Sequence, residues 1–169
     1  MRMTMNRYIK FVILAVLAST MVVRASAYAA TASMSLSPGT ASRAVGSTFS
    51  VSIYENSGAE PVNVAEATLA FNASQLRLTG ISCSGSFEIA APAGANGLSC
   101  ATVNAKTGSQ LVGTATFKTL VGSGSGAVSF SGAHVYSANT NSDIAGGTSG
   151  ANYTFITPVV VPAEVTPTP

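Results

Sequence analysis

Apolar and small polar residues alternate along almost the whole of this chain, and this alternation constrains its fold more than any other feature. Residues 49–54 read Phe-Ser-Val-Ser-Ile-Tyr, and residues 66–71 read Glu-Ala-Thr-Leu-Ala-Phe. Successive side chains of a strand point to opposite faces, so a period of two predicts strands with one buried face. No segment beyond the first thirty residues keeps the 3.6-residue period of a helix. We therefore expect an all-β fold.

Turn residues separate the alternating segments. Examples are residues 37–39 (Ser-Pro-Gly), residues 56–58 (Asn-Ser-Gly) and the glycine-serine run at residues 122–126. Gly and Asn accept a positive φ and Pro presets its own φ, so these residues gather in tight turns. Short strands with turns at this spacing predict an antiparallel β-sandwich.

Residues 1–30 have the layout of a secretory signal peptide. A basic start is followed by the mostly apolar residues 11–23 and by two small-x-small motifs within residues 25–29. A membrane-spanning helix needs about 20 apolar residues, and this run is shorter. We expect cleavage after Ala29 or Ala30 and a mature protein that is secreted or at the cell surface and does not span a membrane. An uncleaved anchor helix is the alternative.

The charge of the chain changes sign once this segment is set aside. The whole sequence carries a formal charge of +2, but four of its eight basic residues lie within residues 1–24, where there is no acid. The remainder has four basic residues against six acidic ones, a net charge of −2. Nucleic-acid binding and polybasic membrane binding both need a dense basic surface, so neither is expected.

The chain divides into three parts. Residues 31–157 are long enough for one domain with a substantial core. Residues 158–169 contain four of the seven prolines, which favour extended structure and cannot donate to a sheet, so this segment is predicted to be a linker or tail. Whether the sequence is a fragment of a longer surface protein stays open.

Cys83 and Cys100 are the two cysteines. In an exported chain two cysteines usually form a disulfide, and a loop of this length would add about 3 kcal/mol to stability. Two buried free thiols are the alternative. A metal site would need further ligands, and the chain has one histidine, His134. We expect neither a metal nor a cofactor.

Four segments, in their order along the chain, resemble the cohesin domain. They are VGSTFSVSI at residues 45–53, VNVAEATLAFN with QLRL at residues 62–78, LVGTATFK at residues 111–118 and GAVSF at residues 126–130. The resemblance implies a jelly-roll sandwich of about nine strands. It also implies a non-catalytic receptor for a dockerin module, which carries its own Ca²⁺, so that the receptor needs no metal.

The resemblance also implies a partner surface on the strand at residues 63–71. The contact carboxylate of the family falls at Glu66, whereas the polar residue two positions earlier is replaced by Val64. Side-chain alternation places Thr68 and Ala70 on the same outward face as Glu66. We interpret these three residues as candidate partner contacts; a solvated charge with plain strand residues beside it is the alternative.

Two other functions stay open. A carbohydrate-binding module would present aromatic side chains to a polysaccharide; the chain has no tryptophan, but Tyr54 falls out of phase with the core and is a candidate glycan contact. Tyr136 and Tyr153 are further candidates for exposure. A structural spacer in a surface protein is the third possibility.

No catalytic constellation is evident. His134, with Asp143 nine residues further on, is the one candidate general base, and no G-x-S-x-G nucleophile elbow precedes a helix. The glutamates lack the aromatic subsites of a glycoside hydrolase. We therefore interpret His134 as a surface histidine and expect no enzymatic activity.

Overall fold

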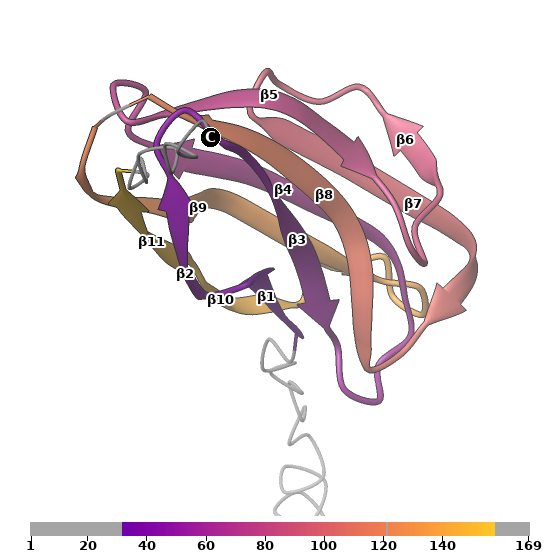
Figure 1. Cartoon of the computed structure of the whole chain (residues 1–169). Helices are drawn as coiled ribbons and strands as arrows, with labels where there is room; N and C mark the ends of the chain where they lie inside the picture. Colours follow the sequence, from indigo (N-terminus) through magenta and orange to yellow (C-terminus); the bar gives the residue numbers. More distant parts are fainter. Residues whose placement is uncertain (1–31, 121, 158–169) are drawn as a thin grey trace, which may run out of the picture.

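The computed structural model describes residues 32–120 and 122–157, which form a two-layer β-sandwich (Figure 1). The all-β prediction is confirmed. The predicted signal peptide and the predicted Pro-rich tail lie outside the described residues and stay predictions. Within the described residues, no helix is long and apolar enough to cross a membrane.

The described residues form eleven strands in two sheets. Sheet A has the order β10-β1-β3-β8-β5, and sheet B has the order β2-β11-β9-β4-β7-β6. Sheet A comprises β10 (Ala145–Ser149), β1 (Ala32–Ser37), β3 (Thr48–Asn56), β8 (Ser109–Thr119) and β5 (Leu76–Cys83). Sheet B comprises β2 (Thr40–Ala44), β11 (Ala151–Ile156), β9 (Gly124–Ser137), β4 (Val62–Phe71), β7 (Gly97–Lys106) and β6 (Ile89–Ala91).

The strand count differs from the expected nine because each terminal strand is broken and serves both sheets. The chain leaves sheet A at Pro38 and enters sheet B as β2, and near its other end it leaves sheet A at Gly150 and enters sheet B as β11. Counting each broken strand once gives nine. The pairs β1–β10 and β2–β11 are parallel, while all other pairs are antiparallel, so the sandwich is not wholly antiparallel.

Buried and less buried residues alternate along the strands, as the period of two predicted for β3 and β4. In β11, for example, Ala151, Tyr153 and Phe155 are buried and the residues between them are exposed. Tyr153, expected from the sequence as a candidate for exposure, is therefore a core residue. Its ring packs 4.8 Å from that of Phe49, and its hydroxyl donates a hydrogen bond to the carbonyl oxygen of Pro38. The prediction for Tyr153 was wrong because the residue lies at an inward position of β11, between the inward residues Ala151 and Phe155.

The predicted disulfide is confirmed. Cys83 at the end of β5 and Cys100 in β7 are bonded, with 2.02 Å between their sulfurs. Because β5 belongs to sheet A and β7 to sheet B, this bond joins the two layers covalently.

Glu55 is a buried carboxylate that the sequence reading missed. It continues the inward series of Phe49, Val51 and Ile53 on β3, and its side chain is fully buried. Neither carboxylate oxygen has a hydrogen-bond partner among the described residues. Burial raises the pKa of Glu55 to about 7, and the nearby Ser57 hydroxyl, which lowers it, offsets this only in part.

Candidate functional site

The outward surface of strands β9, β4, β7 and β6 in sheet B forms the candidate site, and we call it the central face. Residues directly opposite in neighbouring strands share a face. In one row across the strands, Glu66 of β4 lies opposite both Ser99 of β7 and His134 of β9. In the next row, Val64 lies opposite Ala101 and Tyr136.

The structure places all three candidate contacts of β4 on this face. Ala65, Ala67 and Leu69 are buried in the core, so the residues between and after them point away from it. Thr68 is exposed, and Glu66 and Ala70 are half-buried. Glu66, Thr68 and Ala70 therefore share one surface, and their role as partner contacts stays a proposal.

The carboxylate of Glu66 is oriented by its neighbour on β7. The Ser99 hydroxyl donates a hydrogen bond of 2.8 Å to Oε1 of Glu66. No salt bridge joins Glu66 to a basic side chain among the described residues. The salt bridge found among them joins His134 to Asp143, and it is an ion pair only when the imidazole is protonated. The carboxylate of Glu66 is thus held in place without a lysine or arginine partner among the described residues.

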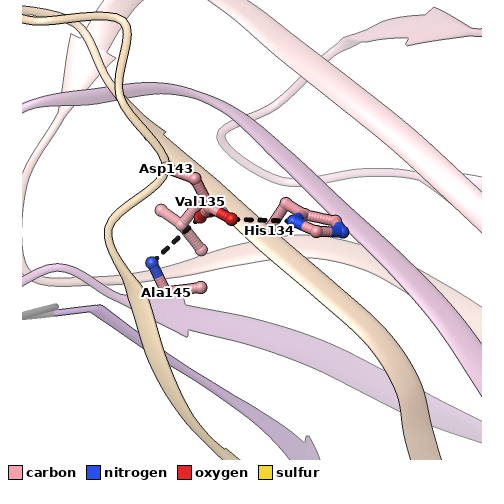
Figure 2. Close-up of polar contacts among 4 residues, drawn as sticks. All are labelled: His134, Val135, Asp143 and Ala145. Carbon is pink, nitrogen blue, oxygen red and sulfur yellow. Dashed lines mark hydrogen bonds and ion pairs between the residues drawn. The ribbon is translucent and has the colours of Figure 1, made fainter.

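His134 is paired with Asp143 at the side of the central face (Figure 2). Nδ1 of His134 lies 2.7 Å from Oδ2 of Asp143, while the backbone N–H groups of Val135 and Ala145 donate to Oδ1 at 3.1 and 3.0 Å. Burial alone would raise the pKa of Asp143, but the hydrogen bonds from His134, Ala145 and Val135 outweigh it and lower the pKa below its ordinary value.

The His134–Asp143 pair has the geometry of a base with its orienting carboxylate. A hydrolytic triad also needs a nucleophile hydrogen-bonded to the other ring nitrogen, and no described residue makes that bond. Among residues 32–120 and 122–157, no group of three or more His, Cys, Asp or Glu side chains is arranged to hold a metal ion.

An apolar row runs beside Glu66, and the sequence reading did not find it as a unit. It consists of Tyr136, Val64, Ala101 and Ile89, which face one another across β9, β4, β7 and β6. Ile89 is 44% exposed, and Val103, two residues beyond Ala101, is 77% exposed. The one signal in the sequence was Val64, an apolar residue at an outward position.

Tyr136 has a second neighbour on this face. Its ring stacks on that of His134 at a centroid separation of 6.3 Å. Burial, and then the negative charges of Glu66 and Asp143, raise the pKa of the Tyr136 hydroxyl above its ordinary value. The apolar row is therefore in contact, along β9, with the neighbouring row that contains Glu66 and His134.

A pocket of about 260 Å³ opens beside Glu66 on the central face. The side chains of Glu66, Thr68, Ser99 and His134 line it from the strands, and Pro92–Gly94 line it from the segment that connects β6 to β7. Gly132, opposite Thr68, has no side chain to fill it. The pocket thus combines one carboxylate, one imidazole and two hydroxyls with a wall of proline and alanine.

Tyr54 lies elsewhere. It is half-buried on β3, where it pairs with Ser35 of β1 and Leu111 of β8 in sheet A. The structure therefore does not bring the candidate glycan contact together with Glu66, and the two would form separate binding surfaces.

Comparisons with known proteins find structures with a similar fold but no match to a family model or to a curated protein. No protein-family model matches the chain, and no curated protein matches it. Among solved structures, the third ScaB cohesin of R. flavefaciens in complex with a group 1 dockerin shares 14% identity and covers 76% of this chain and 96% of its own, with a TM-score of 0.63.

Two other solved structures agree with this. A non-cellulosomal cohesin of the archaeon Archaeoglobus fulgidus shares 17% identity over 75% of this chain and 91% of its own, with a TM-score of 0.59. The cohesin CaCohA2 of Clostridium acetobutylicum shares 17% identity over 73% of this chain and 91% of its own, with a TM-score of 0.57. At these identities the likeness is one of fold.

Proposed function

We propose that this chain, which has the cohesin fold, is a non-catalytic module that binds a protein partner of the dockerin type through its central face. Two of the cohesins with this fold were solved in complexes with dockerins. The observation that carries the proposal is the central face itself: a sheet surface with an apolar row beside one oriented carboxylate.

The central face has the composition of a protein interface. The core of such an interface is apolar with few charges, and aromatic residues such as tyrosine are enriched there. Tyr136, Val64 and Ala101 supply the apolar part, and Glu66 supplies one charge that sets orientation. In this proposal Glu66, Thr68 and Ala70 contact the partner, and Val64 makes the specificity differ from that of family members with a polar residue there.

The cellular setting belongs to the same proposal. Residues 1–30 direct export, residues 31–157 are the binding module, and residues 158–169 connect it to whatever follows or end as a tail. The protein acts outside the cell or at its surface and has no catalytic role. In this proposal the partner carries its own Ca²⁺.

A binding panel tests this function. The full chain, expressed with its own N-terminal segment, is immobilised and exposed to a set of dockerin modules with Ca²⁺ and with a chelator. We expect at least one dockerin to bind and the chelator to release it, because the Ca²⁺ holds the partner's fold. No chelator-sensitive binding across the panel would contradict the proposal.

The same preparation separates the two alternatives. A carbohydrate-binding module would be retained by polysaccharide columns, and Tyr54→Ala would abolish that retention without touching the central face. A structural spacer would show neither dockerin binding nor retention. No geometric observation favours carbohydrate binding or a spacer role over protein binding through the central face.

A further inference from the structure

We propose that the pocket beside Glu66 receives a lysine or arginine side chain of the protein partner. This inference rests on the proposed function and specifies the chemistry that the partner must present. It is carried by three observations: an unneutralised carboxylate in the pocket wall, the distribution of basic residues, and the size and lining of the pocket.

The carboxylate of Glu66 has remaining capacity to accept hydrogen bonds. A carboxylate offers about four lone-pair sites on two oxygens. Ser99 uses one site on Oε1, and no described residue donates to Oε2. The Ser99 hydroxyl therefore fixes the group while leaving one oxygen free, and that oxygen belongs to a residue lining the pocket. A cationic donor would complete the set.

No lysine or arginine of the described part supplies such a cation. These side chains are Arg43 on β2, Arg77 on β5, Lys106 at the end of β7 and Lys118 on β8. Arg77 and Lys118 belong to sheet A, and Lys106 lies opposite Val62 rather than Glu66. Arg43 is held over the rings of Phe49 and Tyr153. The lining contributes the carboxylate of Glu66 and the imidazole of His134, which is a cation only when protonated, and Asp143 adds a second carboxylate behind His134, so carboxylates outnumber possible cations here.

The size and lining of the pocket suit a single side chain. Small-molecule sites usually enclose about 300–1,000 Å³, whereas this pocket measures about 260 Å³. Lysine and arginine place their aliphatic stems on apolar surface while the charged end reaches a polar group. Pro92 and Ala93 offer that surface on one wall, and Glu66, Ser99 and Thr68 offer polar groups on the strands.

A small cation tests the pocket without any partner. The ¹⁵N-labelled full chain is titrated with n-butylguanidinium and, separately, with the neutral n-butylurea, which has nearly the same shape. We expect saturable shifts of the Glu66, Thr68, Gly94 and Ser99 amides with the cation. Because hydrogen bonds to a charged group are the strong ones, n-butylurea should bind about tenfold more weakly or worse.

Variants localise the effect. Glu66→Gln keeps the shape of the side chain and should weaken n-butylguanidinium about tenfold or more, whereas Glu88→Gln removes an exposed carboxylate that does not line the pocket and should change nothing. Equal binding of the urea, equal binding to Glu66→Gln, or shifts confined to another surface would each overturn the proposal.

Dockerin binding to the wild type and to the variants distinguishes a failure of this proposal from a failure of the proposed function. If a dockerin binds the wild type and Glu66→Gln binds it equally well, the pocket proposal is wrong and the function stands. If n-butylguanidinium saturates the pocket but no dockerin binds, the cation preference is supported and the dockerin assignment is wrong. Loss of dockerin binding in Glu66→Gln but not in Glu88→Gln supports both.

Discussion

The outer faces of the two sheets differ although both are built from strands of the same alternating type. On sheet A, the outward positions of β3 and β8 are largely serine and threonine, for example Ser50 opposite Thr116. On sheet B, the corresponding positions carry Tyr136, Val64 and Ala101 beside the Glu66 row. Small hydroxyl side chains keep a sheet surface hydrated, whereas an apolar row next to a fixed charge offers apolar surface that a partner can bury. The comparison teaches that the inward residues determine the fold, while the outward residues of one sheet distinguish a binding surface from an inert one.

The largest expected effect concerns the bond that joins the two sheets. Replacing both cysteines, Cys83→Ala with Cys100→Ala, should lower the free energy of unfolding by about 3 kcal/mol, because the cross-link constrains the unfolded chain. Urea unfolding of the two proteins measures this. Hydrogen exchange should rise more at Ser99, next to Cys100, than at Thr116 in the middle of sheet A. An unchanged unfolding midpoint would contradict the prediction, and a reducing agent should not affect the double variant.

The second effect distinguishes the interior side of sheet A from its hydrated exterior. The pKa of Glu55 is raised to about 7 in the folded protein from 4.5, so the folded state binds a proton that the unfolded state has released between these values. Stability should therefore fall as pH rises from about 4.5 to 7, by up to about 3 kcal/mol, and stay lower above pH 7. Urea unfolding as a function of pH measures this slope.

Glu55→Gln supplies the control for that slope. The variant cannot titrate at this position, so the fall in stability attributable to Glu55 should disappear. The exposed Glu88, changed to Gln, should leave the slope as it is in the wild type. A wild-type slope that survives in Glu55→Gln would show that another group causes it.

The third effect tests the comparison of the faces directly. Ala101→Arg places a long charged side chain in the apolar row of the central face. It should lower the affinity for a dockerin by about thirtyfold or more, the range of an interface hot spot. Ser50→Arg makes the matched change on the outer face of sheet A and should alter affinity less than twofold. Calorimetric titration of both variants measures this; equal losses in the two would remove the distinction between the faces.

The smallest effect concerns the pair at the side of the central face. The pKa of Asp143 is lowered in the folded protein, so its contribution to stability is present above its ordinary value of 3.8 and is lost as pH falls through the lower folded value. The His134–Asp143 pair is well exposed, so Asp143→Asn should cost no more than about 1 kcal/mol at neutral pH. Thermal unfolding measures the loss; one well above this limit would mean that the two backbone hydrogen bonds dominate.

Much of this architecture was predictable from local pattern. The period of two predicted β3 and β4, and the phase of β4 placed Glu66, Thr68 and Ala70 outward. The turn residues at 37–39 and 56–58 predicted breaks between strands, but of the run predicted as a turn at residues 122–126 the last three residues begin β9. The same rule applied one residue further along β3 would have predicted that Glu55 is buried, because it follows Phe49, Val51 and Ile53 at the same spacing.

The remainder depends on contacts between segments distant in the sequence. Ser99 and His134 meet Glu66 only because β7 and β9 flank β4 in one particular register, and a shift of one residue would turn each to the other side of the sheet. The crossing of each terminal strand from one sheet to the other depends on where the partner strands end. The pocket needs Pro92–Gly94, in the segment that connects β6 to β7, as one of its walls. None of these is encoded within a single strand.

The broken terminal strands also determine how the domain would respond to being stretched. β2, near the start of the domain, and β11, at its end, run parallel with five opposed residue pairs, from Thr40 with Asn152 to Ala44 with Ile156. A pull on the two ends in opposite directions acts along these strands, so it loads all the backbone hydrogen bonds between them at once instead of peeling them apart singly. The parallel pair β1–β10 in the other sheet is arranged in the same sense. The segments through which tension would enter the domain are thus the ones that fasten both sheets.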